Sequence, residues 1–110
     1  MTPEGEVKSA VKTILDKNKP HVYYHMPVQW GVGKPTLDFV GCCCGAYFTI
    51  ETKAPGKVPT PIQMLTMEKV ADAGGTVFII DASEGLPIQE LDEWVQQRVL
   101  AFTSAGRRWW

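Results

Sequence analysis

Two carboxylates and one lysine of this chain stand at a spacing that suits metal-assisted chemistry. Glu51 and Lys53 are two positions apart in a run with strand character, and alternate residues of a strand project from the same face. Asp38 begins the preceding strand of a predicted hairpin and reaches that face if the register permits. Two carboxylates beside one lysine can hold a divalent cation and activate a water, as phosphodiester hydrolysis by a metal-dependent nuclease requires.

The first element that must position these residues is a helix at the start of the chain. Thr2 is a suitable N-cap and Pro3 suits the first helical position, while Asn18-Lys19-Pro20 ends the pattern. Its apolar stripe is Val7, Ala10, Val11, Ile14 and Leu15.

Three strands are predicted after this helix. The first covers residues 21–26, and a hairpin pairs residues 37–42 with residues 46–53 through a turn near Cys44-Gly45.

Two further helices and one strand complete the pattern. Thr60 as N-cap and Pro61 open the second helix, which ends at Gly74-Gly75. Residues 76–80 are apolar on both faces, so we expect a strand that is covered on both sides. After a loop at residues 81–85, the last helix has an apolar face made by Leu91, Trp94, Val95, Val99 and Phe102. The order αβββαβα predicts an α/β fold, a restriction-endonuclease-like mixed β-sheet flanked by helices.

Length and composition indicate one ordinary globular domain that spans residues 1–110. The chain is 45% apolar and 21% charged, which is typical of a folded domain. It has no apolar run of the ~20 residues that a membrane-spanning helix needs. Its first residues lack the basic-then-apolar pattern of a signal peptide, so we expect a cytoplasmic protein.

The three cysteines are consecutive, Cys42-Cys43-Cys44. Neighbouring cysteines rarely satisfy disulfide geometry, and zinc sites need pairs at a wider spacing together with further ligands. We interpret these residues as small apolar strand or turn residues in a reducing compartment.

The formal net charge of −1 lacks the basic excess that most nucleic-acid-binding proteins have. Metal-binding carboxylates lower the net charge, however, and bound cations reverse the local sign. The terminal residues 107–110, Arg-Arg-Trp-Trp, add positive charge and stacking surface, or are a frayed end or a dimer contact.

Several motifs together resemble the VRR-NUC domain, a family of the PD-(D/E)xK nuclease superfamily, over residues 2 to 82. The motifs are Pro3-Glu4-Gly5-x-Val7-Lys8, Met26-Pro27-Val28-Gln29, Gly31-x-Gly33, Leu37-Asp38-Phe39-x-Gly41, Gly45-x-x-Phe48-x-Ile50-Glu51-x-Lys53, Gln63 and Gly74-Gly75. The opening motif resembles the start of the small stand-alone members, many of which are phage-encoded. One departure is visible, because the family's usual proline before the aspartate is Leu37 here.

The resemblance implies a role for each matched residue. Asp38 and Glu51 would be metal ligands for Mg²⁺ or Mn²⁺, with the backbone carbonyl of Thr52 as a further ligand. Lys53 would be the catalytic lysine, and Gln63 would line the site. The alternative for Glu51 and Lys53 is a solvated strand face with a surface ion pair worth under ~1 kcal/mol.

Glu4 and Glu6 compete for the role of a third carboxylate. At about 100° per residue, Glu4 lies toward the apolar stripe of the first helix and Glu6 lies toward solvent. An acid on the inward face needs a partner, which a divalent cation would supply. We therefore assign Glu4 to the catalytic and metal-binding site; the alternative is that Glu4 only complements the helix N-terminus. His25 and Lys8 are left outside the site.

The resemblance also implies the substrate and the assembly. Stand-alone members of the family are associated with branched DNA, including four-way (Holliday) junctions, and with homodimers. A two-fold dimer would present two sites to a symmetric junction. We predict a structure-selective endodeoxyribonuclease; the alternatives are a less selective flap or duplex nuclease, and a non-catalytic DNA-binding module.

Overall fold

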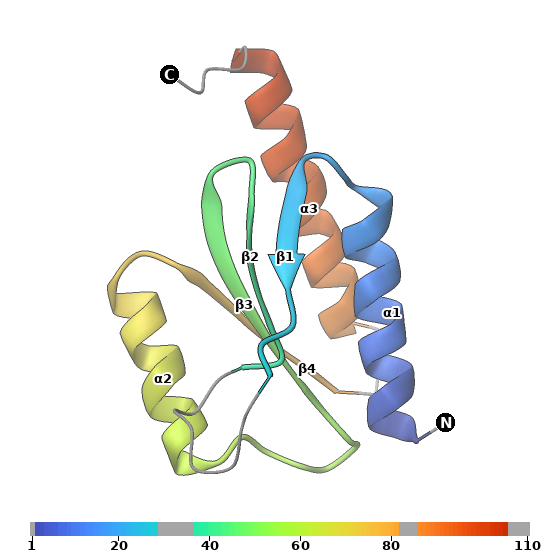
Figure 1. The fold of residues 1–110 in the computed structure, drawn as a ribbon, viewed down its shortest axis with the longest axis vertical. Coiled ribbons are helices and arrows are strands. Elements are labelled where there is room, and N and C mark those ends of the chain that lie inside the picture. The colour runs from blue at the N-terminus through green and yellow to red at the C-terminus, as the bar shows by residue number, and fades with distance from the viewer. Residues whose placement is uncertain (1, 29–36, 82–85, 106–110) are drawn as a thin grey trace.

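The computed structural model describes residues 2–28, 37–81 and 86–105 (Figure 1). Residues Gln29 and Gly31 to Gly33 of the family-like motifs, and the Arg107–Trp110 tail, lie outside this part. The elements are α1 (Pro3–Lys17), β1 (Val22–His25), β2 (Phe39–Cys43), β3 (Ala46–Lys53), α2 (Pro61–Asp72), β4 (Thr76–Asp81) and α3 (Leu86–Ala105). The predicted order αβββαβα and the α/β class are confirmed.

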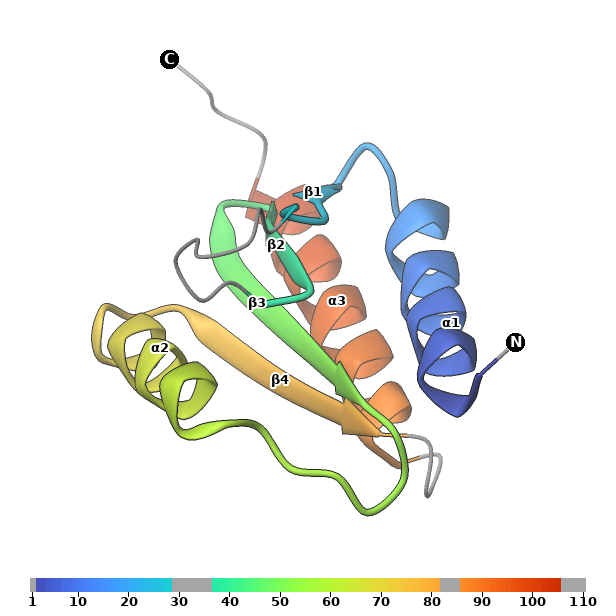
Figure 2. The same ribbon diagram turned by 60° about the horizontal axis from the view of Figure 1, so that its bottom comes forward.

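The four strands form one mixed sheet in the order β1-β2-β3-β4. The pairs β1–β2 and β2–β3 are antiparallel, whereas β3 and β4 run parallel because α2 connects them. Helices α1 and α3 lie side by side on one face of the sheet, and α2 lies on the other side next to β4 (Figure 2). The face that carries α2 is therefore covered only in part.

The hydrophobic core fills the space between the sheet and the helix pair α1 and α3. Its fully buried members include Leu15 from α1, Phe39, Phe48 and Ile50 from the sheet, and Leu91 from α3. Helix α2 contributes Met67 as its buried residue. The core thus fixes β2 and β3 from one side, whereas the opposite side of β3 carries the buried polar residues Thr49 and Glu51.

Helix α1 forms as its sequence predicts. Thr2 Oγ1 accepts a 3.0 Å hydrogen bond from the amide of Gly5, Pro3 occupies the first turn, and Asn18 is the C-cap. The buried face contains Val7, Val11, Ile14 and Leu15. Ala10, which was assigned to the same stripe, is exposed.

The β2–β3 hairpin is the scaffold of the site. Its turn places Cys44 and Gly45 at φ angles of 51° and 87°, a left-handed conformation that glycine adopts without strain. In the middle of β2, a Cβ on Gly41 would overlap the backbone of Tyr23 and Tyr24, so glycine lets β1 approach closely. The turn near Cys44-Gly45 is confirmed.

The cysteines are free thiols, as the sequence analysis expects. Cys43 is fully buried in the core, while Cys42 and Cys44 are half-buried. Burial raises the pKa of the Cys43 thiol to about 12, which keeps it neutral and unreactive.

The prediction that residues 76–80 are covered on both faces is wrong. Strand β4 is an edge strand, and Ile79 is 48% exposed on the side where α2 gives incomplete cover, whereas Ile80 on the core side is buried. Asp81 belongs to β4 and not to the following loop.

Helix α3 buries Leu91 and Val95 as expected, with Trp94, Val99 and Phe102 partly buried on that face. Within the described residues, no helix is long and apolar enough to cross a membrane.

Candidate active site

Glu51 and Lys53 lie at the end of β3 and project from the face opposite the main core. The Lys53 ammonium is 3.1 Å from Glu51 Oε2, and the lysine side chain is 15% exposed. Glu51 itself is only 3% exposed. A buried carboxylate with a nearby lysine differs from the solvated ion pair that was the alternative interpretation of these residues.

The register of the hairpin brings Asp38 to this pair. Phe39 pairs with Ile50, so the preceding residue Asp38 lies next to Glu51, and its amide donates to Glu51 Oε1 at 3.2 Å. Asp38 Oδ2 accepts hydrogen bonds from both the amide and the hydroxyl of Thr52, at 2.9 and 2.6 Å. These contacts hold the two carboxylates beside each other. Leu37, which stands where the family has proline, is buried and anchors the entry to the hairpin.

Gln63 reaches Glu51 from the first turn of α2. Its side-chain amide donates to Glu51 Oε2 at 2.7 Å. Its side-chain carbonyl accepts from the amide of Thr60, and its own backbone amide donates to Thr60 Oγ1, which completes a capping box. The same glutamine thus caps α2 and fixes the buried carboxylate.

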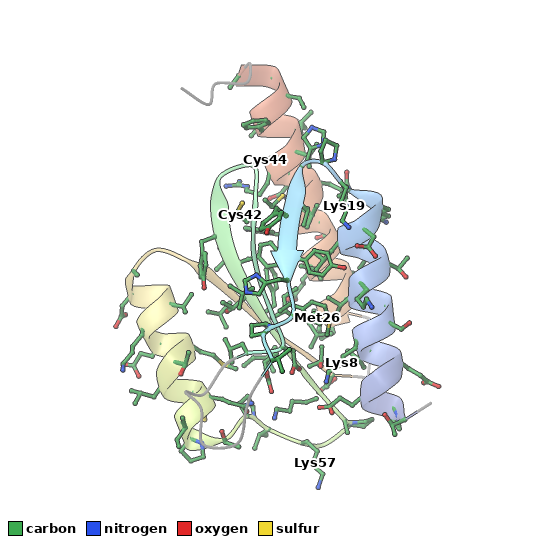
Figure 3. The ribbon with its side chains drawn as sticks, viewed as in Figure 1. Lys8, Lys19, Met26, Cys42, Cys44 and Lys57 are labelled. Atoms are coloured by element: carbon green, nitrogen blue, oxygen red, sulfur yellow. The ribbon has the colours of Figure 1, made fainter. Side chains whose placement is uncertain are left out.

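Lys8 was left outside the site by the sequence analysis, but the structure brings it there. Its ammonium is 3.8 Å from Asp38 Oδ1, with the two side chains 35% and 25% exposed. Figure 3 shows Lys8 on the side of α1 that faces the end of the sheet. Lys8 directly follows Val7, which belongs to the buried stripe of α1. This adjacency is the sequence signal that could have found it.

Glu4 and Thr52 are the other two residues that the sequence predicts as metal ligands. Glu4 is half-buried on the first turn of α1 and Glu6 is exposed, which agrees with the predicted helix phase. In the described part of the chain, no three His, Cys, Asp or Glu side chains are grouped as a metal site, so the role of Glu4 as a third carboxylate beside Asp38 and Glu51 stays a prediction. Thr52 is fully buried, and its amide and hydroxyl both donate to Asp38, while the role of its carbonyl as a metal ligand stays a prediction.

The electrostatics of the site favour a cation at the two carboxylates. Burial raises the pKa of the Glu51 carboxyl above its ordinary value, and the neighbouring charge of Asp38 raises it further, while Lys53 and the Asp38 amide oppose these effects. Carboxylate oxygens are the ligands that Mg²⁺ and Mn²⁺ prefer. The two carboxylates repel each other, and Lys8 and Lys53 are their counter-charges. A divalent cation would relieve this repulsion further. The donor set therefore fits such an ion through Asp38 and Glu51.

Comparison with known proteins finds similarity among solved structures. No protein-family model matches the chain, and no curated protein does. A solved structure described as "VRR_NUC domain" is similar with a TM-score of 0.63 and 18% identity, covering 91% of this chain and 97% of that one. Identity at this level shows the fold alone. The chain therefore has the fold of a VRR_NUC domain, as the sequence motifs implied.

Proposed function

We propose that this protein is a divalent-metal-dependent endonuclease that hydrolyses phosphodiester bonds in DNA. The observation that carries the proposal is the convergence of Asp38, Glu51 and Lys53, with Gln63 fixing the buried carboxylate. The similarity in fold to the structure described as "VRR_NUC domain" supports it.

In this proposal Asp38, Glu51 and the carbonyl of Thr52 hold Mg²⁺ or Mn²⁺, with Glu4 assisting directly or through water. When bound, such an ion lowers the pKa of a coordinated water and neutralises charge on the scissile phosphate. Lys53 orients the attacking water or stabilises the negative charge of the transition state as a point charge. The expected products carry a 5′-phosphate and a 3′-hydroxyl.

Gln63 and Thr52 hold the carboxylates of Glu51 and Asp38 in place. Gln63 keeps Glu51 Oε2 directed toward the site, and Thr52 holds Asp38 Oδ2 through two hydrogen bonds. A carboxylate that is held before substrate binds loses less conformational freedom when the catalytic complex forms.

The finer proposal is a four-way-junction resolvase that acts as a homodimer, of the small stand-alone and phage-encoded type, working in the cytoplasm of a host cell. A chain of 110 residues offers little surface to grip two duplex arms, whereas a two-fold dimer matches a symmetric junction. Light scattering should then give a mass near twice 12.2 kDa. A monomer at micromolar concentration that still cuts junctions symmetrically would contradict the dimer.

The test is single-turnover cleavage of labelled four-way, flap, single-stranded and duplex DNA. Mg²⁺ or Mn²⁺ should support cutting, Ca²⁺ should support binding with little cutting, and EDTA should abolish cutting. Asp38→Asn and Lys53→Ala should each lower the rate by orders of magnitude at a temperature where circular dichroism shows that both variants are folded. Asp92→Asn is the matched control, because Asp92 pairs with Lys17 at the surface, away from this site.

Each outcome of that assay separates the candidates. Preferential cutting of the junction supports the resolvase, whereas equal cutting of flap or duplex DNA supports the less selective nuclease. Binding without cutting under every metal condition would leave a DNA-binding module and refute the enzymatic proposal. Efficient cutting in excess EDTA would refute the metal mechanism.

A further inference from the structure

Two exposed tyrosines lie in one row across the sheet face that carries the candidate active site. Tyr23 pairs with Cys42 and Cys42 pairs with Tyr47, so the three side chains lie side by side on one face. Tyr47 is four residues before Glu51 on β3 and shares its face by strand alternation. Figure 3 labels Cys42, the middle residue of this row. We call Tyr23, Cys42 and Tyr47 the tyrosine row.

The rings of the tyrosine row are free to meet a ligand. Tyr23 is 72% and Tyr47 is 47% exposed. Neither side chain makes a hydrogen bond, ion pair or ring contact with another described residue, whereas Tyr24 on the opposite face packs on Phe39 and bonds Asp16. Large aromatic side chains left without partners on a sheet face are the feature that nucleic-acid-binding sheets use to stack bases.

A pocket next to Tyr47 adds a positive charge to this surface. It has a volume of about 520 Å³ and lies between the start of β3 and the second half of α2, lined by Tyr47, Thr66, Lys69, Val70 and Gly75 among others. Gly75 allows the close approach, because a Cβ there would press on Val70 and on the Tyr47 ring. Lys69 is exposed at the rim. A ring, a hydroxyl and an ammonium together suit a nucleotide, whose base stacks and whose phosphate is anionic.

The position of the tyrosine row relative to the carboxylates also suits a strand of nucleic acid. Tyr47 and Glu51 are four positions apart on β3, a distance of about 13 Å. Nucleotides of a helical strand are spaced at about 3.4 Å, so about four of them span this distance in helical form, and an extended unpaired strand needs fewer. Exposed aliphatic residues, which would favour a protein partner, lie near the row but not in it: Ile62, Met64 and Leu65 are on α2, and Ile79 is on β4.

We propose that Tyr23, Tyr47 and Lys69 form a binding surface for unpaired bases, a few nucleotides from the bond cleaved at Asp38 and Glu51. The part of this inference that concerns cleavage rests on the proposed nuclease function. Stacking on the rings requires base faces that a continuous duplex hides between neighbouring pairs. The surface therefore selects DNA with a single-stranded segment beside the cleavage point, such as an open branch point or a flap.

The first test measures binding alone, in EDTA, with a fluorescein-labelled oligothymidine and a duplex of the same length. Wild type should bind the single strand more tightly than the duplex. Tyr23→Ala and Tyr47→Ala should each weaken single-strand binding by about 5- to 100-fold, and Tyr23→Phe and Tyr47→Phe should restore it. Lys69→Gln should reduce the slope of log affinity against log salt by about 0.7.

Matched controls separate this effect from a general change of the surface. Leu100→Ala removes a 68% exposed apolar side chain from α3, and Lys12→Gln removes an exposed charge from α1. Both controls should bind the single strand as wild type does. Thermal melts of all variants should agree within a few degrees, since the tyrosines are exposed.

The outcomes distinguish this inference from the nuclease proposal. Unchanged oligothymidine binding in both alanine variants, or no binding by wild type, would overturn the base-binding surface whatever the cleavage results. Dissociation of a dimer by Tyr23→Ala or Tyr47→Ala, with single-strand affinity unchanged, would overturn it in favour of a contact between two chains. Normal binding without cleavage of any DNA would refute only the nuclease proposal.

Discussion

The side chain of Gln63 joins the buried carboxylate of Glu51 to the N-terminus of α2. Its amide nitrogen donates to Glu51 Oε2 at 2.7 Å, and its carbonyl oxygen accepts from the amide of Thr60 at 3.0 Å. The formation of the first turn of α2 and the orientation of Glu51 are therefore coupled through one residue. Gln63 therefore has two roles, capping α2 with Thr60 and holding Glu51, and substitutions can test the two roles separately.

Gln63→Leu and Thr60→Ala should separate capping from carboxylate positioning. Thr60→Ala removes the hydroxyl that accepts from the backbone amide of Gln63. It should therefore lower the unfolding free energy by about 1 kcal/mol and leave cleavage nearly intact. Gln63→Leu removes the two side-chain bonds, one from the Thr60 amide and one to Glu51, while the Thr60 hydroxyl still accepts from the backbone amide of residue 63, so it should lower stability and also the single-turnover rate. Urea unfolding and cleavage kinetics measure the two effects, and equal rate losses in the two variants would mean that Gln63 acts only through the helix.

Lys8 should oppose cation binding at Asp38, because its ammonium is 3.8 Å from Asp38 Oδ1. Lys8→Gln should therefore tighten Mg²⁺ binding in the absence of DNA by about threefold to tenfold. The partly exposed ion pair contributes little to folding, so the unfolding free energy should change by less than ~1 kcal/mol.

Lys12→Gln is the control for Lys8, since Lys12 is exposed on the same helix and contacts no described carboxylate through an ion pair. Calorimetric titration of Mg²⁺ into both variants gives the comparison. Weaker Mg²⁺ binding by Lys8→Gln than by wild type would show that the lysine supports the ion instead of competing with it.

Local signals in the sequence were sufficient for most of the fold. Thr2 with Pro3 and Thr60 with Pro61 began their helices at the predicted residues, because capping depends on short-range contacts. The prediction that residues 76–80 are covered on both faces was wrong, because an apolar sequence does not reveal how far a single helix covers an edge strand. The sheet order and the partial cover by α2 are tertiary properties.

The candidate site was predictable where one strand or one hairpin sets the geometry. Glu51 and Lys53 share a face by alternation, and Asp38 joins them through the register of a short turn. Lys8 was missed, because its approach to Asp38 depends on how α1 crosses the sheet. The capping role of Gln63 was missed as well, although Thr60 and Gln63 have the spacing of a capping box.

The ionisation of Glu51 should make the metal-free protein less stable as pH rises. The pKa of Glu51 is raised in the folded state, chiefly by burial, so the folded protein binds more protons than the unfolded chain above the ordinary value of 4.5. Stability therefore falls with rising pH from the ordinary pKa through the raised one, and is constant above it with respect to this group. Glu51→Gln should flatten this dependence and be the more stable protein at neutral pH in EDTA.

Urea unfolding of wild type and Glu51→Gln between about pH 4.5 and 8 measures this difference. Glu90→Gln is the control, because Glu90 is exposed on α3. Parallel stability curves for wild type and Glu51→Gln would show that burial does not perturb this carboxylate.

The two acids in the first turn of α1 should differ in their effect on the metal. Glu4 is half-buried and precedes Lys8 by one helical turn, on the side of α1 that leads to Asp38, whereas Glu6 is exposed. Glu4→Gln keeps the shape of the side chain and removes its charge, so it should weaken Mg²⁺ affinity and slow cleavage. Raised Mg²⁺ should partly restore the rate, because binding follows mass action.

Glu6→Gln should change stability by less than ~0.5 kcal/mol and leave the Mg²⁺ dependence as in wild type. Cleavage rates across a Mg²⁺ titration compare the two variants, and a shift for Glu6→Gln without one for Glu4→Gln would exclude Glu4 as the third carboxylate.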